Sequence, residues 1–446
     1  MIKNLYKYII VFSFCGVVVS FVDASEIGVY DAWVRVQSVN GAIKASKNAK
    51  DASALKTESA KSMYLPKVTI SGSYTHLSDP IHLSGDIDLS LLHKSFSYNI
   101  DLSEQNVFLA NLHALWPLYT GGKIDAMQAI YKANVVQQDA MLEMKKDEEF
   151  LKLVKYYYGV VVSRSLYETS RHYADALKIH YENAKKMKEQ GQIADIELLN
   201  AKVKLDEANV ELTKAKHKFE IASSAFALLI KSDDKVSCRF DIAKSLQDEE
   251  FYQNKTKHDF KALKVLDAKK KQSEMLLKIK KADFYPTVSG FANYNLYRDD
   301  SVLMQTLPKW FAGVMVSIDI LKRSDRSQEI KIAQMRNKEV EYLKEDALQN
   351  LEILVQKTYK EMMLYKEEYY SLNSTVKLAQ ENYRLRDLSF KEGLCTSVEL
   401  VDARTILLGA KTKQLNALYN FIEKLSQLCV LSGDRDMFFK FMGVEG

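Results

Sequence analysis

The chain has 446 residues, 47% hydrophobic and 27% charged, so it can bury a core, and its length alone suggests two or three domains. Only 5 prolines and 16 glycines occur, too few to punctuate many short elements, and long uninterrupted helices are expected. The formal net charge of +5 comes from 63 basic and 58 acidic residues that are interspersed along the chain. There is no basic block of the kind that tracks phosphates, which argues against nucleic acid as a partner.

The first residues have the features of an export signal. Lys3 and Lys7 precede an apolar run over 8–22, and small residues follow where a signal peptidase cuts, so residues 1–24 are predicted to be a signal peptide. The apolar run is shorter than the roughly 20 residues of a membrane anchor. A lipoprotein processed at Cys15 is disfavoured because a bulky residue precedes that cysteine. We therefore expect an exported chain without an inner-membrane helix.

The remaining chemistry-bearing residues are scattered. Cys238, Cys395 and Cys429 are an odd number at wide spacing, which is neither a disulfide framework nor a metal cluster, and whether Cys238 and Cys429 pair stays open. The histidines lack ligand-spaced partners, so no metal site is expected. No nucleophile elbow or phosphate loop occurs, so we expect no enzyme activity and no cofactor.

The same plan occurs twice along the chain, beginning with a helix that ends at a proline. The alanine- and lysine-rich segment 26–63 predicts a helix that ends before Pro66. Segment 262–284 predicts a second helix, ending before Pro286, which lies 220 residues after Pro66 (286 minus 66). This spacing indicates an internal duplication.

After each proline the period changes from helical to two. Alternation of apolar and polar residues predicts four strands of about 9 to 12 residues, at about 67–77, 107–119, 286–297 and 309–321. A transmembrane sheet with a wet lumen fits this pattern, and a soluble half-buried sheet shows the same alternation. Aromatic residues near the strand ends favour the membrane version. Four strands cannot close a barrel, so several protomers would have to share one.

The connections between these strands differ in length. Segment 78–106 is long and polar, as expected of an outward-facing loop, and 298–307 is a shorter connection.

Very long helices follow the strands. Segment 123–190 contains no proline and predicts one helix of roughly 65 residues and about 100 Å, and 325–392 repeats it. Gly191 and Gly393 break these helices, and the chain then turns back. The returning segments carry an a/d heptad seam of large and small residues, and the second seam lies 202 residues after the first (393 minus 191). The first seam begins with Ala194, Leu198, Ala201, Leu205, Ala208 and Leu212 and continues to Leu229, and the second includes Leu400, Ala403, Leu407 and Ala410 and continues to Leu431.

The predicted organisation is therefore a duplicated unit of helix, β-hairpin, very long helix and returning helix. The boundaries are a signal peptide at 1–24, a first structural repeat at 25–232, a connector at 233–257, a second structural repeat at 258–433 and a C-terminal tail at 434–446.

The ordered motifs resemble the TolC-like outer-membrane efflux protein family over essentially the whole mature chain. They are the proline entries Leu65-Pro66 and Tyr285-Pro286, the segment Trp-Pro-Leu-Tyr-Thr-Gly-Gly at 116–122, and the glycine turns at 191–201 and 393–403. The resemblance implies a mainly α fold with transmembrane β-strands. In a trimer, three times four strands would form a twelve-stranded β-barrel in the bacterial outer membrane, continued by an α-helical tunnel into the periplasm.

The resemblance also implies a function and partners. The chain would be a passive exit duct for drugs or other small molecules in a tripartite efflux system, a homotrimer in outer-membrane lipid. Its partners would be a periplasmic adaptor (membrane fusion protein) and an inner-membrane pump, proton-driven or of the ABC type. Protein export in a type I secretion system is an alternative within the channel class. A soluble periplasmic coiled-coil scaffold is an alternative of another class.

The turns after the two glycines are the candidate functional site. Glu399 and Asp402 stand three apart and share a helix face, and ordinary first-turn acids favoured by the helix dipole are the competing interpretation. Matching acids in the family line the tunnel entrance, which implies that these two form a periplasmic gate. Glu197 and Asn200 occupy the same places in the first copy and would flank it.

The tip turns carry the remaining candidates. Thr396 and Glu399 have capping-box spacing, so Thr396 is predicted to cap the returning helix, and Asp195 is the cap candidate in the first copy. Some relatives have an arginine where this chain has Cys395, and the bend at 321–325 also departs from the first copy. The resemblance assigns adaptor docking to the tip turns, which contain Gly191, Gln192, Ile193, Gly393, Leu394 and Cys395.

Overall fold

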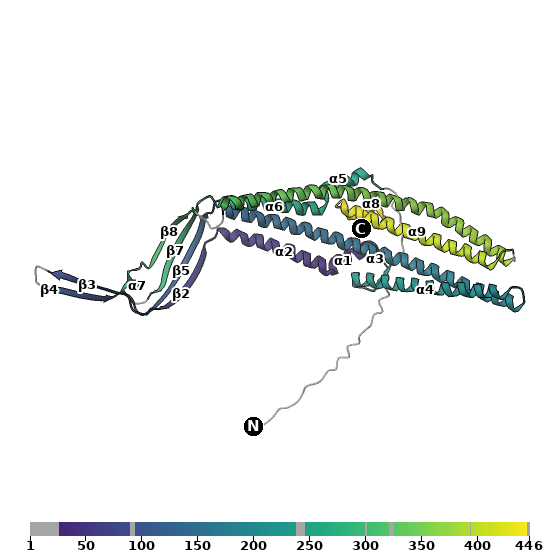
Figure 1. Ribbon diagram of the computed structural model, residues 1–446, viewed down its shortest axis with the longest axis horizontal. Helices are drawn as coiled ribbons and strands as arrows, with labels where there is room; N and C mark the ends of the chain where they lie inside the picture. Colours follow the sequence, from purple (N-terminus) through teal and green to yellow (C-terminus); the bar gives the residue numbers. More distant parts are fainter. Residues whose placement is uncertain are drawn as a thin grey trace, which may run out of the picture.

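The chain is elongated, with its strands at one end and its helices running to the other (Figure 1). The computed structural model describes residues 26–89, 94–237, 246–298, 301–320, 325–392 and 394–443. The predicted signal peptide at 1–24, Cys238, Gly393 and the departing bend at 321–324 lie outside the described residues.

Two helices open each half of the chain: the helix predicted at 26–63 is divided in two, whereas the helix predicted at 262–284 is present and is preceded by an additional one. They are α1 (Val29–Val39) and α2 (Gly41–Lys61) in the first repeat, and α5 (Glu249–Asp259) and α6 (Lys261–Ala282) in the second. Asn40 interrupts the first pair because it is extended, with ψ 124°, and its side chain caps α2 by accepting hydrogen bonds from the amides of Ala42 and Ile43. Phe260 interrupts the second pair with the same ψ of 124°. Helix α5 lies largely within the segment expected to be a connector.

One antiparallel sheet joins the two repeats. Its order is β2-β5-β7-β8, so the pairing of β5 with β7 brings the repeats together. Its strands are β2 (Lys67–His76), β5 (Asn106–Tyr119), β7 (Thr287–Arg298) and β8 (Trp310–Ser317). Strand β8 is shorter than predicted, ending before Asp319. Polar pairs such as Ser71 opposite Asn111 share one face, and apolar pairs such as Ile70 opposite Leu112 share the other.

The predicted loop at 78–106 is wrong in part, because it contains a second hairpin. Strands β3 (His82–Leu89) and β4 (Lys94–Asp101) form a separate two-stranded sheet that projects beyond the first one (Figure 1). Leu83 faces Ile100 and Ile87 faces Phe96 across this pair. The shorter connection holds a helical turn, α7 (Val302–Thr306).

The long helices follow the predicted plan. Helix α3 (Lys123–Glu189) has 67 residues and α8 (Arg326–Lys391) has 66, and each is followed by a returning helix, α4 (Asp195–Ile230) or α9 (Ser397–Leu431). Among the described residues, no helix combines the length and the apolar character that crossing a membrane requires.

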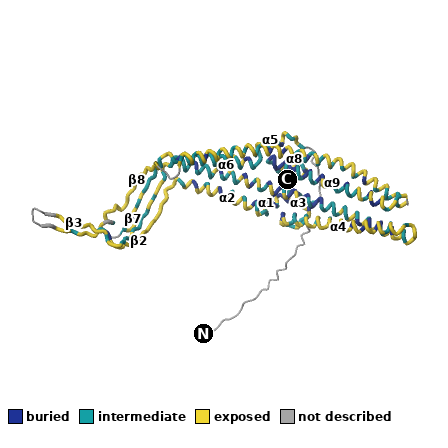
Figure 2. The backbone as a smooth tube through the Cα atoms, in the orientation of Figure 1, coloured by how far each residue is buried: buried dark blue, intermediate teal, exposed yellow. Residues whose placement is uncertain are grey.

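The buried side chains gather in the middle of the helical body (Figure 2). The predicted C-terminal tail forms part of this core: helix α10 (Asp436–Phe441) buries Phe438 completely against Phe150 of α3. Gly433 makes the turn into α10 with φ +74°, and a Cβ there would lie 2.6 Å from the Asp259 carbonyl oxygen. Two short parallel strands, β1 (Glu26–Ile27) and β6 (Lys235–Val236), contribute Ile27 and Val236 to the same core.

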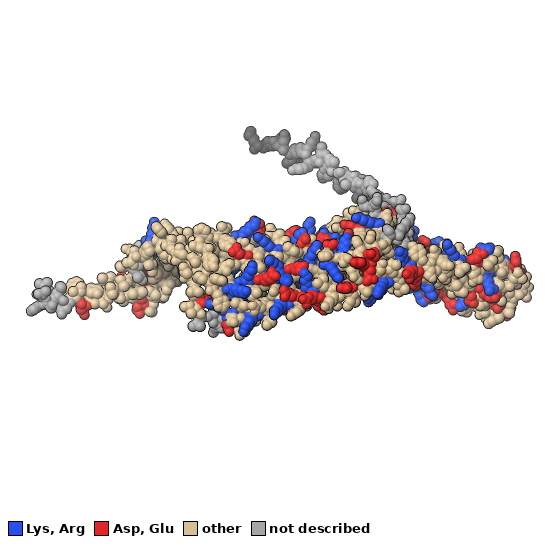
Figure 3. Space-filling view, turned by 90° about the horizontal axis from the view of Figure 1, so that it is seen from above, with Lys and Arg blue, Asp and Glu red and all other residues tan. Residues whose placement is uncertain are grey.

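Charge is distributed unevenly along the molecule. On the face seen in Figure 3, basic and acidic side chains interleave over the helical body and are sparse over the strands. Many of these side chains form ion pairs one helical turn apart, such as Lys202 with Asp206 at 2.8 Å. The strand region therefore presents mainly uncharged side chains.

Candidate functional site at the helical tip

The first tip turn is closed by backbone hydrogen bonds that glycine makes possible. The amide of Gly191 donates to the Lys188 carbonyl at 2.9 Å, and that of Gln192 to the Met187 carbonyl at 2.8 Å. This is a Schellman motif, with Gly191 at φ +72° in the left-handed region. In the second copy the amide of Leu394 makes the matching bond to Ser389, also at 2.8 Å. Both chain reversals therefore end their long helix in the same way.

The second returning helix begins with the predicted capping box. The Glu399 amide donates to the Thr396 hydroxyl at 3.3 Å, and the Thr396 amide donates to the Glu399 carboxylate at 2.8 Å. The other Glu399 oxygen accepts a bond from Arg386 of α8 at 3.1 Å. Hydrogen bonds from Thr396, and then the charge of Arg386, lower the pKa of Glu399. Glu399 therefore stays ionised, and its charge is shared with two groups of its own protomer.

The first returning helix begins differently from the expectation. Ala194 is the N-cap residue and makes no side-chain capping bond, and Asp195 lies one position inside the helix. The prediction of Asp195 as the cap is therefore wrong, because its carboxylate pairs with Lys188 of α3 at 2.5 Å. An ion pair across the turn replaces a cap.

The four candidate gate residues differ in their surroundings. Asp402 and Asn200 are exposed, and neither has a hydrogen bond or ion pair within the described part of the chain. Glu197 is partly buried, and its Oε2 lies in the protein without a hydrogen-bond partner among the described residues. Glu399 is exposed but already bonded. Asp402 is thus an acidic gate candidate that makes no ion pair among the described residues, and the nearby cation that its charge influences, Lys204, pairs with Glu207.

Two hollows lie between the tips of the two helical hairpins. One of about 450 Å³ is lined by Glu197 of α4, Gln192 and Ile193 of the first turn, and Cys395 of the second. The other, of about 710 Å³, is lined mainly by α3 and α8. The structure thus brings both tip turns to the same place, although they are about two hundred residues apart in sequence.

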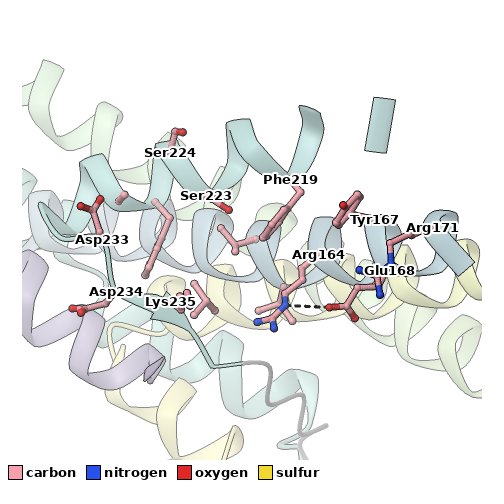
Figure 4. Close-up of a pocket in the computed structure, with 15 residues that line it drawn as sticks. Arg164, Tyr167, Glu168, Arg171, Phe219, Ser223, Ser224, Asp233, Asp234 and Lys235 are labelled. Carbon is pink, nitrogen blue, oxygen red and sulfur yellow. Dashed lines mark hydrogen bonds and ion pairs between the residues drawn. The ribbon is translucent and has the colours of Figure 1, made fainter. Parts of the chain in front are cut away.

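A further hollow of about 490 Å³ lies higher in the body, between α3, α4 and the segment that leads to β6 (Figure 4). Arg164 points toward Glu168 with their side chains 3.3 Å apart, and the rings of Tyr167 and Phe219 stack at 6.1 Å. Asp234 pairs with Arg35 of α1. Arg164, Glu168 and Asp234 of this hollow thus make contacts within the protomer, which favours a structural role.

Sequence reasoning missed the residues that join separate helices at the tip. Arg386 pairs with Glu399, and the guanidinium of Arg404 lies over the Tyr383 ring at 4.5 Å. His180 of α3 bonds to Ser397 at the start of α9. In the sequence, Tyr173, Leu177 and His180 are spaced by four and three residues, which places His180 on one face of its helix but does not identify its partner.

Exchanging the cap residues at the two tips tests their contribution. Thr396→Ala is expected to destabilise the start of α9 by about 1 kcal/mol, because it leaves the Glu399 amide without its acceptor. Ala194→Thr, which places a threonine three residues before Glu197, is expected to stabilise the start of α4 by a similar amount. Amide hydrogen exchange over the first turn of each helix measures both effects. Unchanged exchange in Thr396→Ala would show that the cap contributes nothing.

The architecture defines a class of protein: a duplicated, mainly helical chain whose paired long helices continue from a small antiparallel sheet with one apolar face. The model of the outer membrane efflux protein family matches residues 35–230 and 259–434, and the chain belongs to this family. It is therefore an outer-membrane channel that extends into the periplasm, and the family consists of channels rather than enzymes. No curated protein matches the sequence.

Solved structures share the fold at low sequence identity. The Campylobacter jejuni CmeC outer membrane channel is 15% identical with a TM-score of 0.74, over 91% of this chain and 86% of that one. The open state of the Neisseria gonorrhoeae MtrE outer membrane channel is 14% identical with a TM-score of 0.73, over 91% and 89% of the two chains. The Vibrio cholerae outer membrane protein VceC is 12% identical with a TM-score of 0.71, over 91% and 96%.

Proposed function

We propose that three copies of this chain form the exit duct of a tripartite efflux system for drugs or other small molecules. The observation that carries the proposal is the four-stranded sheet, in which β2 and β8 are outer strands without a further strand partner among the described residues. Unpaired backbone groups in hydrocarbon cost several kcal/mol each, so the free edges need other copies. Three copies supply twelve strands and close a barrel.

The apolar face of the sheet supports its contact with lipid. Ile70 is 72% exposed, Trp310 65% and Val316 65%. A soluble protomer would leave this continuous apolar face in water, at a cost of about 25 cal/mol for each Å². Outer-membrane lipid would cover it.

The helical tip is the proposed entrance. Asp402 and Glu399 would form two rings of three carboxylates in a trimer, with Glu197 and Asn200 beside them. The tip turns, including Gln192, Ile193, Leu394 and Cys395, would dock a periplasmic adaptor linked to an inner-membrane pump. The adaptor, the pump and the cargo follow from family resemblance, and a type I secretion system would use the same duct.

Reconstitution tests the proposal. Detergent-purified protein is expected to have the mass of a trimer and to conduct ions across a planar bilayer, with small currents while the tip is narrow. A chain that stays soluble and monomeric without detergent would support the coiled-coil scaffold instead. Copurification followed by mass spectrometry would identify the inner-membrane partner, and that partner distinguishes small-molecule efflux from protein secretion.

A further inference from the structure

Helices α3 and α9 are joined near the tip by a ladder of three side-chain pairs, here called the tip seam. The spacing on α3 is four and three residues, and on α9 four and four, so each set lies on one helix face. From the body toward the tip, the pairs are Tyr173 with Thr405, Leu177 with Val401, and His180 with Ser397.

The three pairs differ in chemistry. The Tyr173 and Thr405 hydroxyls are 2.9 Å apart, and Leu177 and Val401 belong to one small buried cluster. His180 makes the last pair, through Nε2 and the Ser397 hydroxyl. The seam connects the α3–α4 hairpin to the α8–α9 hairpin, so breaking it would let the two tips move independently.

His180 is the member of the tip seam whose side chain has an ordinary pKa near neutral pH. It is only 4% exposed, and its ring lies 5.1 Å from that of Phe390 on α8, so one side chain contacts both helices of the opposite hairpin. Burial, and then the positive charge of Arg404, lower the pKa of His180. The site therefore favours a neutral ring.

The charged groups around His180 offer it no carboxylate partner in this state. Asp387 lines the adjoining hollow but pairs with Lys391 at 2.7 Å. The other ionisable groups lining the two hollows around His180 are Lys186 from α3, Glu197 from α4, Glu392 and Cys395 beyond the end of α8, and Arg404 from α9. A protonated ring would thus be buried beside a cation, with only Glu197 carrying an unpartnered buried oxygen.

We propose that the tip seam is a pH-dependent latch, in which protonation of His180 separates the two hairpins and loosens the entrance of the duct in an acidic periplasm. The inference rests on the proposed function, because an entrance exists only in a channel. Glu197 would receive the charged ring once it leaves Ser397, which assigns this residue a role in the loosened state.

The direction of the effect follows from proton linkage. The pKa of His180 is lowered in the joined state and returns toward its ordinary value of about 6.5 when the tips separate and water reaches the ring. The joined state is therefore fully favoured above about pH 6.5 and loses stability as the pH falls below it. Each unit between the two pKa values shifts the balance of the states about tenfold.

The test compares single-channel conductance at about pH 7.5 and about pH 5.5, a window in which histidine changes charge. Glu399 stays ionised throughout, since its pKa is lowered. Wild type is expected to open up to about tenfold more often at the lower pH, because about pH 5.5 lies one unit below the ordinary pKa of histidine. His180→Gln keeps a polar side chain without a titration and should abolish the response. His217→Gln is the matched control, because His217 is exposed and bonded only to Glu220 within its own helix, at 3.1 Å.

A second variant and a second measurement separate the possible failures. Ser397→Ala removes the hydrogen bond and leaves the buried ring, so it should retain the pH response. Amide exchange over 397–405, compared between wild type and His180→Gln at the same pH, should show protection lost only in acidic wild type. A response that persists in His180→Gln, or its absence from conducting wild type, would overturn the latch. A trimer that conducts under no condition would instead count against the proposed function.

Discussion

Replacing Arg435 with methionine is expected to destabilise the protein by about 3 to 5 kcal/mol, since it removes one partner from a buried charge cluster. The Arg435 side chain is 17% exposed and donates to Asp147 at 2.6 Å and to the Glu143 carboxylate at 2.9 Å. Without it, the two acids of α3 lose their shared cation. The loss should appear as a lower melting temperature of the detergent-solubilised protein, followed by circular dichroism.

The two carboxylates respond differently to their surroundings, which gives the variant a pH signature. Burial raises the pKa of Asp147, and Arg435 offsets only part of this effect. Burial also pushes the pKa of Glu143 upward, but hydrogen bonds from Lys146 and Arg435 outweigh it and leave the pKa lowered. Without Arg435 the pKa of Asp147 would rise further. The variant should therefore regain stability relative to wild type as the pH falls and Asp147 binds a proton.

Two further variants control this result. Arg384→Met removes a cation from an exposed pair with Glu381, where the side chains are 57% and 55% exposed, and should destabilise the protein far less than Arg435→Met does. Adding Asp147→Asn to Arg435→Met should recover part of the loss, because it removes an uncompensated buried charge. Equal melting temperatures for Arg435→Met and Arg384→Met would show that the cluster adds no stability.

Replacing both Glu399 and Asp402 with alanine is expected to raise the basal conductance and to weaken block by multivalent cations about tenfold or more. A multivalent cation is attracted by a ring of carboxylates, and this attraction is stronger in a narrow mouth, where the effective dielectric constant is lower than in bulk water. About 1.4 kcal/mol corresponds to a tenfold change in affinity, so losing even part of this attraction has a large effect. Titration of the open-channel current with a trivalent cation measures the block.

The structure separates the expected effects of the two acids. Asp402→Asn should account for most of the lost block, because no group of its own protomer pairs with that carboxylate among the described residues. Glu399→Gln should weaken block less and loosen the tip more, since Glu399 is bonded to Thr396 and to Arg386. Asp206→Asn is the control, because Asp206 is an exposed acid on α4 that pairs with Lys202. Unchanged block in the double variant would contradict the gate assignment.

Local sequence patterns were sufficient for the repeated plan. Proline entries, the period of two, the a/d seam and the terminal glycines each reflect contacts within a few residues, and the structure contains the long helices and the antiparallel sheet that they predict. Thr396 and Glu399 are another local signal, because a capping box is made by residues three apart. The offset of 202 residues then recurs in the Schellman bonds at 192 and 394.

Local patterns failed where a short-range signal was weak or a competing contact was stronger. The break at Asn40 was missed because a single asparagine within a helical composition is a weak stop signal, yet its side chain caps the next helix. Aspartate is a common N-cap residue, but Asp195 forms an ion pair with Lys188 and lies inside the helix. The projecting hairpin was missed because its apolar residues, such as Leu83 and Phe96, lie within a polar segment.

The sequence by itself determined the secondary structure period, the duplication and the positions of the tips, since each depends on residues that are neighbours along the chain. Only the tertiary structure decided which distant groups meet. Arg435 reaches Glu143 across 292 residues, and His180 reaches Ser397 across 217. Such pairs leave no periodic trace, because one side chain on each helix is enough to make the contact and any helix facing the seam could supply the partner.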